Sequence, residues 1–351
     1  MKFDFVIGNP PYQDNTLGEN DTYAPPVYNK FMDAAYEIAD KVELITPARF
    51  LFNAGSTPKS WNKKMLNDEH FKVLHYEQDS SNVFATTDIK GGVAVTYHDK
   101  TQKFEPIKLF IHFAELKSIL KKVKNHKSFK TLSDIVITRT AYRLTEKMHE
   151  EHPEAEQQLS KGHRYDMSTN IFDRLPQIFF NEKPNDGHQY VKMLGRKNNK
   201  RVYKYIRREY INNVCNLEKY KIILPKSNGS GAIGEVLSTP LIGTPLIGTT
   251  ESFISIGIFD TKLEAENALK YIKGKFSRTM LGILKITQDN PPDCWYYVPL
   301  QDFTSSSDID WSQPIAAIDR QLYKKYNLSA EEINFIETNV KEMKEDEPTD
   351  N

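Results

Sequence analysis

The stretch MKFDFVIGNPPY, residues 1–12, decides how the first part of this chain folds. Residues 3–7 form a short run of β-forming residues, so they predict a buried strand that ends at Gly8. Asn9, Pro10, Pro11 and Tyr12 follow at once. The sequence therefore predicts a polar, proline-stiffened loop at the carboxyl end of a strand.

This loop offers two hydrogen-bond acceptors, the side-chain carbonyl of Asn9 and the backbone carbonyl of Pro10, beside the ring of Tyr12. Each proline fixes φ and lacks an N–H, and Pro10 favours an extended Asn9. Such acceptors suit a planar amine such as that of adenine, whose lone pair is delocalised into its ring. Two acceptors on that amine would localise the lone pair, and Tyr12 would stack on a base outside the double helix. The alternative is an ordinary turn.

Further segments extend the pattern: VELITPARF at residues 42–50, IKGGVAVTY at residues 89–97, and a stretch from about 190 to 340. With the Asn-Pro-Pro-Tyr motif, they make the sequence resemble the adenine-specific DNA methyltransferases of bacterial restriction–modification systems, in the type IIG and Taq-like branch. Protein-glutamine methyltransferases share the tetrapeptide but do not account for a long basic second part.

The resemblance implies that S-adenosylmethionine donates a methyl group to the amino group of a flipped adenine. It implies that Asn9, Pro10, Pro11 and Tyr12 are the catalytic residues. Tyr12 and Tyr97 would stack on opposite faces of the base; the alternative for Tyr97 is a strand-end aromatic that packs on its own domain. Asn9 and Pro47 would contact the cofactor, and no metal is implied.

Composition sets limits on the class of protein. A chain of 351 residues has room for two domains, and 47 basic residues balance 47 acidic ones, so affinity for nucleic acid must come from local patches. The two cysteines, Cys215 and Cys294, have no metal-ligand spacing and form no disulfide framework, which fits a reducing cytoplasm. Nothing in this sequence resembles a signal peptide or a membrane span, so neither is expected.

Basic residues concentrate between positions 190 and 210, where they alternate with four tyrosines. This pattern predicts a strand or hairpin that lies on DNA phosphates, although Tyr/Arg alternation also suits an ordinary exposed strand. The predicted DNA-binding residues are Lys192, Arg196, Lys197, Lys200, Arg201, Lys204, Arg207 and Arg208.

Strand and helix patterns alternate over the first hundred residues and predict an α/β sheet whose active loops lie at the carboxyl ends of its strands. The expected helices cover residues 27–38 and 61–66, and the later strands cover 42–46, 71–77 and 92–97. We expect a partial Rossmann-like methyltransferase sheet in residues 1–128. A mixed α+β target-recognition domain is expected in residues 129–310, and a helical C-terminal segment in residues 311–351.

The usual cofactor-binding half of such enzymes precedes the Asn-Pro-Pro-Tyr loop, and only a few residues do so here. The Gly-rich segment 229–234 is a weak candidate for that role, and we interpret it as a loop of the recognition domain. Half a parallel sheet leaves an apolar edge strand unpaired. Three explanations of the missing half stay open. In the first, a second chain supplies it; in the second, the chain is truncated; in the third, another segment of this chain covers the edge strand and builds an unusual cofactor site.

The sequence thus predicts an adenine-specific DNA methyltransferase whose activity depends on a cofactor-binding half. Its expected partners are double-stranded DNA, a second chain that supplies this half, and a cognate restriction nuclease; no membrane partner is expected. The alternative is a DNA-binding specificity subunit with a vestigial methyltransferase domain.

Overall fold

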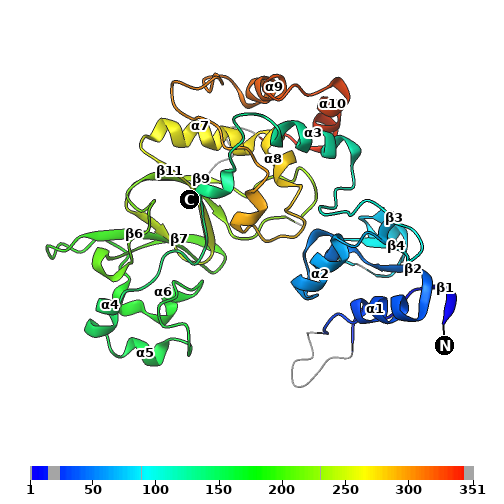
Figure 1. Cartoon of the computed structure of the whole chain (residues 1–351). Coiled ribbons are helices and arrows are strands. Elements are labelled where there is room, and N and C mark those ends of the chain that lie inside the picture. The colour runs from blue at the N-terminus through cyan, green and yellow to red at the C-terminus, as the bar shows by residue number, and fades with distance from the viewer. Residues whose placement is uncertain (1, 15–23, 88, 230, 344–351) are drawn as a thin grey trace. The chain divides into compact units, whose positions relative to one another are not determined.

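The computed structural model describes residues 2–14, 24–87, 89–229 and 231–343. Contacts between α carbons divide the chain into two compact units, Met1–Ala114 and Glu115–Asn351. Figure 1 shows the elements of the first unit in blue to cyan and those of the second in green to red. The functional domain boundaries at residues 128 and 310 stay predictions.

The first unit contains a four-stranded sheet with the strand order β1-β2-β4-β3. β1 pairs in parallel with β2, and β4 pairs antiparallel with both β2 and β3, so β1, β2 and β3 run in the same direction. The strands are β1 (Phe3–Gly8), β2 (Ala39–Pro47), β3 (Phe71–Glu77) and β4 (Val93–Asp99). This mixed α/β sheet contains each strand that was predicted from the sequence.

Two α-helices and two short 3₁₀ helices connect these strands: α1 (Tyr28–Ile38), η1 (Ala48–Phe52), α2 (Lys59–Leu66) and η2 (Ser80–Asn82). The core between helices and sheet includes Met32, Phe50, Met65 and Phe71, all fully buried. The helix expected over residues 27–38 is present. However, its apolar residues do not all face the core, because Phe31 and Ile38 are exposed.

Strand β1 lies at the edge of the sheet, and in the described part of the chain only β2 pairs with it. Phe3, Phe5 and Ile7 occupy one face of β1, and their side chains are 45%, 62% and 76% exposed. An exposed apolar edge strand offers unpaired backbone groups to a further strand. The prediction that residues 3–7 form a buried strand is therefore wrong, because only Val6 of β1 is partly buried, whereas the open apolar edge expected of half a parallel sheet is present.

The second unit contains two sheets in its described residues, with strand orders β10-β6-β7 and β5-β11-β8-β9. Their strands are β5 (Val136–Ile137), β6 (Tyr190–Lys197), β7 (Lys200–Arg207), β8 (Tyr220–Pro225), β9 (Leu241–Gly243), β10 (Ile247–Thr249) and β11 (Phe253–Phe259). β6 and β7 form the hairpin predicted for residues 190–210, with Asn198 and Asn199 at positive φ in its turn.

The second unit also contains several helices. They are α3 (Ala114–Lys124), α4 (Glu146–Glu151), α5 (Ala155–Gln158), α6 (Ile171–Arg174), α7 (Lys262–Lys273), α8 (Lys275–Leu281), α9 (Ile315–Lys325) and α10 (Ala330–Asn339). Of these, α4, α5 and α6 lie near strands β6 and β7 (Figure 1). The short 3₁₀ helices are η3 (Leu132–Ile135), η4 (Pro176–Ile178), η5 (Arg208–Tyr210) and η6 (Pro292–Trp295).

Two of these helices begin at capping residues, which the pattern Ser/Thr-x-x-Glu marks in the sequence. Ser329 accepts from the backbone N–H of Glu332, whose side chain accepts from the Ser329 N–H, a complete capping box at α10. Thr261 caps α7 in the same way, but its partner Glu264 reaches the N–H of Asp260 instead. No helix in the described residues is both long and apolar enough to span a lipid bilayer.

Candidate functional site

The Asn-Pro-Pro-Tyr loop leaves the carboxyl end of β1, where Gly8 lies opposite Leu44 of β2. Asn9 and Pro11 are exposed, whereas Pro10 and Tyr12 are partly buried. The backbone carbonyl of Tyr12 accepts a hydrogen bond of 3.1 Å from the N–H of Val27, which ties the end of the loop to the start of α1. The loop is therefore anchored at its tyrosine, while its asparagine remains accessible.

A cavity of about 500 Å³ lies beside this loop. Its volume is within the range of small-molecule sites. Because β1 and β2 are parallel, their carboxyl ends meet at one edge of the sheet, and both Tyr12 and Pro47 reach the cavity from there. The described residues that line it are Tyr12, Gln13, Ala24, Pro26, Tyr28, Pro47, Arg49, Gly55, Ser56, Thr87, Ile89 and Lys90.

Tyr12 presents its ring to this cavity as a neutral phenol. Burial raises the pKa of Tyr12 to about 12, so the hydroxyl stays protonated at neutral pH. Phe84, in the segment after η2, meets the Tyr12 ring edge-on, with 6.3 Å between ring centroids and 72° between planes. The sequence analysis did not identify Phe84. Its position a few residues before the IKGGVAVTY segment, which was singled out, could have indicated it.

Tyr97 is not brought into this cavity. In the pairing of β2 with β4, Val93 lies opposite Pro47 at the cavity end, whereas Tyr97 lies opposite Glu43, further along the strand. Its hydroxyl donates to Asp99 Oδ2 at 2.9 Å, and the ammonium of Lys72 lies 5.2 Å from its ring centroid. Tyr12 and Tyr97 therefore have separate surroundings within the first unit.

The charge of the cavity is relevant to what it can bind. Arg49 and Lys90 line it, and none of its described lining residues is an aspartate or a glutamate. The amino group and ribose hydroxyls of S-adenosylmethionine donate hydrogen bonds, for which carboxylates are suitable acceptors. The described residues of this cavity therefore fit a base and an anion, but they do not provide a complete site for this cofactor. Asn9 is not among the residues that line it.

The Gly-rich segment 229–234 does not form a phosphate cradle in its described residues, which exclude Ser230. The carboxylate of Glu235 already accepts from the N–H groups of Gly231 and Ala232, at 2.8 and 2.9 Å. A Cβ at Gly231 would lie 2.1 Å from the backbone carbon of Ile286, so this glycine is required by close packing. The segment is a packed loop of the second unit.

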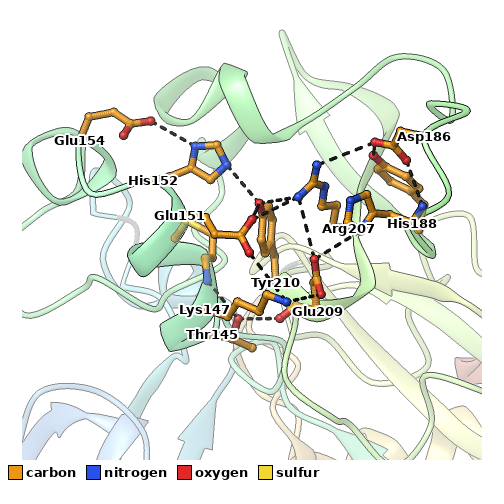
Figure 2. Close-up of polar contacts among 12 residues, drawn as sticks. Thr145, Lys147, Glu151, His152, Glu154, Asp186, His188, Arg207, Glu209 and Tyr210 are labelled. Carbon is orange, nitrogen blue, oxygen red and sulfur yellow. Dashed lines mark hydrogen bonds and ion pairs between the residues drawn. The ribbon is translucent and has the colours of Figure 1, made fainter.

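Arg207, at the end of the basic hairpin, is surrounded by carboxylates (Figure 2). Its guanidinium lies 3.1 Å from Glu151, 3.8 Å from Asp186 and 3.9 Å from Glu209. Tyr210 donates to Glu151 at 2.6 Å and accepts from Arg207 at 3.2 Å. This donation from Tyr210 lowers the pKa of Glu151, while burial, followed by the bond to Glu151, raises the pKa of Tyr210 to about 12.

More polar side chains surround this network. Lys147 bridges Glu209 and Glu151, at 2.6 and 3.7 Å. His152 lies between Tyr210 and Glu154, with 3.2 Å from its ring nitrogens to each (Figure 2). Three carboxylates, Glu151, Asp186 and Glu209, thus lie near two permanent cations, Lys147 and Arg207. This end of the hairpin is not a positively charged surface.

The other predicted DNA-binding residues differ in how they are engaged. Arg196 and Lys200 are exposed close to the hairpin turn and form no ion pair with a described carboxylate, although the Arg196 guanidinium lies 5.8 Å from the centroid of the Phe253 ring. The remaining cations have partners within the second unit: Lys192 lies over Tyr203, Lys197 pairs with Asp173, Arg201 donates to Thr239, Lys204 donates to Asn181, and Arg208 donates to Ile211 and Asn213.

No group of three or more His, Cys, Asp or Glu residues is placed to hold a metal ion anywhere in the described ranges. Cys215 and Cys294 are both unpaired thiols, and burial raises the pKa of Cys294 to about 11. The two sites of interest are therefore the cavity beside the Asn-Pro-Pro-Tyr loop and the basic hairpin.

Comparisons with known proteins match parts of this chain, and the family-model match lies in the first unit. Residues 1–84 match the family model described as Eco57I restriction-modification methylase. Over 95 residues, 26% of this chain, the sequence is 32% identical to an "Uncharacterized adenine-specific methylase" of Mycoplasma pneumoniae. These matches confirm the resemblance to restriction–modification adenine methylases. The match covers 22% of that relative's length.

A solved structure, that of the type IIG restriction endonuclease BpuSI, aligns with 90% of this chain and 49% of its own chain. The sequence identity is 8% and the TM-score is 0.34. A TM-score of this size does not establish a common fold.

Proposed function

We propose that this chain contributes the adenine-binding site and the DNA-recognition unit of an N6-adenine DNA methyltransferase in a restriction–modification system. The observation that carries the proposal is the Asn-Pro-Pro-Tyr loop, exposed at Asn9 and anchored at Tyr12 beside a cavity of about 500 Å³. A first unit that matches a methylase family over residues 1–84 supports the same proposal.

In this proposal the target adenine leaves the duplex and stacks on Tyr12. The side-chain carbonyl of Asn9 and the backbone carbonyl of Pro10 accept from its amino group. Both hydrogens are then held, and the nitrogen lone pair is directed away from the ring toward an electrophilic methyl group. The proton that this nitrogen releases after methylation passes to solvent. The two prolines keep these acceptors in place, so little reorganisation is needed during the reaction.

S-adenosylmethionine is the proposed donor, because the acceptor loop requires an electrophilic methyl group that this chain's side chains do not supply. Its ribose and amino groups need acceptors beyond the described lining of the cavity. Asn9 and Pro47 stay predicted contacts to it, both at the carboxyl ends of parallel strands.

The exposed apolar edge of β1 supports the proposal that a further strand joins the sheet there and brings those acceptors. Phe3, Phe5 and Ile7 together are unusually exposed for large apolar side chains in a strand. Either additional polypeptide of the same protein or a second chain fits this role. A cognate restriction nuclease is a further proposed partner.

For the second unit we propose target recognition, with the basic hairpin lying on the phosphates of duplex DNA. Arg196 and Lys200 are the best candidates for phosphate contact, because they are exposed and lack carboxylate partners among the described residues. Phosphate contacts fix the register of a protein on DNA, whereas contacts to base edges provide specificity.

The enzyme proposal is tested by incubating this chain, together with the polypeptide that supplies the missing acceptors, with S-adenosylmethionine and unmethylated bacterial DNA. We expect N6-methyladenine by mass spectrometry, and a strongly reduced yield with the Asn9→Ala variant. Calorimetric titration of S-adenosylmethionine separates the alternative: an assembly that binds DNA but no S-adenosylmethionine, with or without DNA, contains a specificity subunit. Equal methylation by the variant would exclude the loop from catalysis.

A further inference from the structure

Arg49 is the only arginine in residues 1–114, and it lies in the wall of the cavity that contains Tyr12. It belongs to η1, which begins immediately after β2 ends at Pro47. The backbone N–H of Ala48 donates to the carbonyl of Gly92 at 3.0 Å, so the turn that carries Arg49 is fixed to the segment leading into β4. Its backbone position is thus set by the same strand ends that form the cavity.

The side chain of Arg49 is held along its length. Its Nε donates to the carbonyl of Lys90 at 2.5 Å. Gly91 has φ of +87°, and a Cβ there would lie 2.8 Å from Arg49 Cγ; at Gly55 a Cβ would lie 3.2 Å from Arg49 Cβ. Both loops therefore approach the aliphatic stem closely because they carry glycine at these points. The guanidinium is presented by a fixed stem and has little freedom left to lose on binding.

Among the described residues, the hydrogen bond of Arg49 is made by Nε, and none is made by its two terminal nitrogens. No carboxylate in the described part of the chain lies within ion-pair distance of Arg49, and none lines the cavity. With Nε used by a carbonyl, Nη1 and Nη2 remain as a pair of parallel donors, the geometry that binds two oxygens of one anion. The hydroxyls of Ser56 and Thr87 also line the cavity.

Two anions would be present during the proposed reaction, a DNA phosphate and the carboxylate of the methyl donor. S-adenosylmethionine also carries an ammonium and a sulfonium, so its net charge is positive. A wall with arginine and no described acid is unfavourable for that molecule and favourable for a phosphodiester. The described cations of this wall, Arg49 and Lys90, therefore favour the phosphate as the partner of Arg49.

We infer that Arg49 binds a phosphate next to the target adenine on the DNA strand that enters the cavity, while Tyr12 stacks on the base. This inference rests on the proposed function and adds a specific contact to it. A phosphate held at this wall would fix the nucleotide in its extruded position. Arg49 is then a binding residue for the flipped nucleotide, distinct from the hairpin residues that contact the duplex.

The test uses the full chain and the deoxytrinucleotide TAT, with either phosphodiester replaced by an uncharged methylphosphonate. Binding is measured by titration calorimetry. We expect one of the two replacements to weaken binding to the wild type about tenfold, the lower end of a charge-assisted contact. Arg49→Gln should bind intact TAT about tenfold more weakly and should no longer distinguish it from that methylphosphonate. Arg49→Lys should recover part of the loss.

Lys64→Gln is the matched control, because Lys64 is a first-unit cation that pairs with Asp33 at 2.9 Å and does not line the cavity. It should bind all three trinucleotides as the wild type does. Thermal unfolding of each variant checks the fold. If Arg49→Gln does not fold, the wild type and Arg49→Lys still decide the matter through their response to the methylphosphonates.

The outcomes separate this inference from the proposed function. Failure of the wild type to prefer TAT over TTT would overturn the adenine site itself. A preference for TAT with no response to either methylphosphonate, or a response that Arg49→Gln retains, would overturn the role of Arg49 alone. Loss of S-adenosylmethionine binding in Arg49→Gln with unchanged TAT binding would assign Arg49 to the donor carboxylate and also overturn the inference.

Discussion

Arg49 in the first unit and Arg207 in the second are both arginines at the end of a β-strand, yet their surroundings are opposite. Arg49 has a carbonyl on its Nε and no described carboxylate within ion-pair distance. Arg207 has three carboxylates within 4 Å and a tyrosine hydroxyl that binds one of them. The comparison shows that an arginine can bind an external anion only where the fold places no carboxylate beside it.

The same difference applies to the two regions as a whole. Residues 190–210 contain eight Lys or Arg side chains, but those near Arg207 are neutralised by residues from α4 and from the loops before β6. The cavity of the first unit contains fewer cations and no described acid. The number of basic residues in a stretch of sequence is therefore a poor guide to the positive charge of the folded surface. It suggests too much positive charge for the hairpin and too little for the cavity.

The largest expected effect concerns the loop of Asn9, Pro10, Pro11 and Tyr12. This loop lies beside the cavity of the first unit, whereas the hairpin belongs to the second unit. Asn9→Ala should lower the rate of adenine methylation about 10²–10³-fold, as the loss of one preorganised polar contact does. DNA affinity should stay unchanged, because the hairpin residues are untouched. Methylation rates measured by mass spectrometry test this. The exposed Asn82 in η2 supplies the control, and Asn82→Ala should methylate normally.

The next effect concerns the aromatic wall of the cavity. Tyr12→Ala should weaken binding of TAT about tenfold, since base stacking contributes roughly 1–3 kcal/mol. Phe84→Ala should weaken it about threefold, because Phe84 supports Tyr12 edge-on rather than lying under the base. Calorimetry measures both affinities. Tyr97→Ala should have no effect, since Tyr97 lies further along β4; a loss equal to that of Tyr12→Ala would restore it to the base site.

Salt dependence tests the hairpin half of the comparison. Replacement of Arg196 and Lys200 by alanine should reduce the slope of log affinity against log salt by about 2 for duplex DNA, because each phosphate contact contributes roughly 0.9. Arg207→Ala should leave the slope nearly unchanged, because that cation is already paired. Fluorescence anisotropy at several salt concentrations provides the slopes. A larger change for Arg207→Ala than for the double variant would contradict the assignment.

The smallest effect is the pH response of the Arg207 network. The pKa of Glu151 is lower in the folded chain, so its stabilisation is present above its unfolded pKa and is lost as pH falls through the folded value. Tyr210→Phe removes the largest cause of that lowering. The thermal midpoint of this variant should therefore fall less than that of the wild type between pH 6 and acidic pH. Calorimetric scans at each pH, with Tyr220→Phe as control, test this.

Local sequence patterns predicted much of the fold. Apolar runs predicted the strand before Gly8 and the strand that ends at Pro47. Alternation of basic residues and tyrosines predicted the hairpin of residues 190–210. All three elements are present. Capping residues marked the starts of α7 and α10. These features depend on neighbours a few residues apart, which is why the sequence indicates them.

The composition of the candidate site was only partly predictable. Tyr12 and Pro47 meet at one cavity as strand-end residues should, because parallel strands end at the same edge. Phe84 was missed, since it comes from a loop without regular periodicity. Arg49, in η1 just after β2, also lines the cavity, whereas Tyr97 lies further along β4, which runs antiparallel to β2.

The sequence by itself determined the acceptor loop, because Asn9, Pro10, Pro11 and Tyr12 are adjacent and two prolines fix their geometry before any tertiary contact forms. Only the tertiary structure decided which cations are paired with carboxylates of the protein and which can bind an external anion. Arg207 and its acids are brought together from α4, the loop before β6 and η5, whereas Arg49 is packed against two glycine-bearing loops and forms no ion pair with a described carboxylate. The physical reason is that electrostatic pairing depends on separation in space, which distance along the chain does not encode.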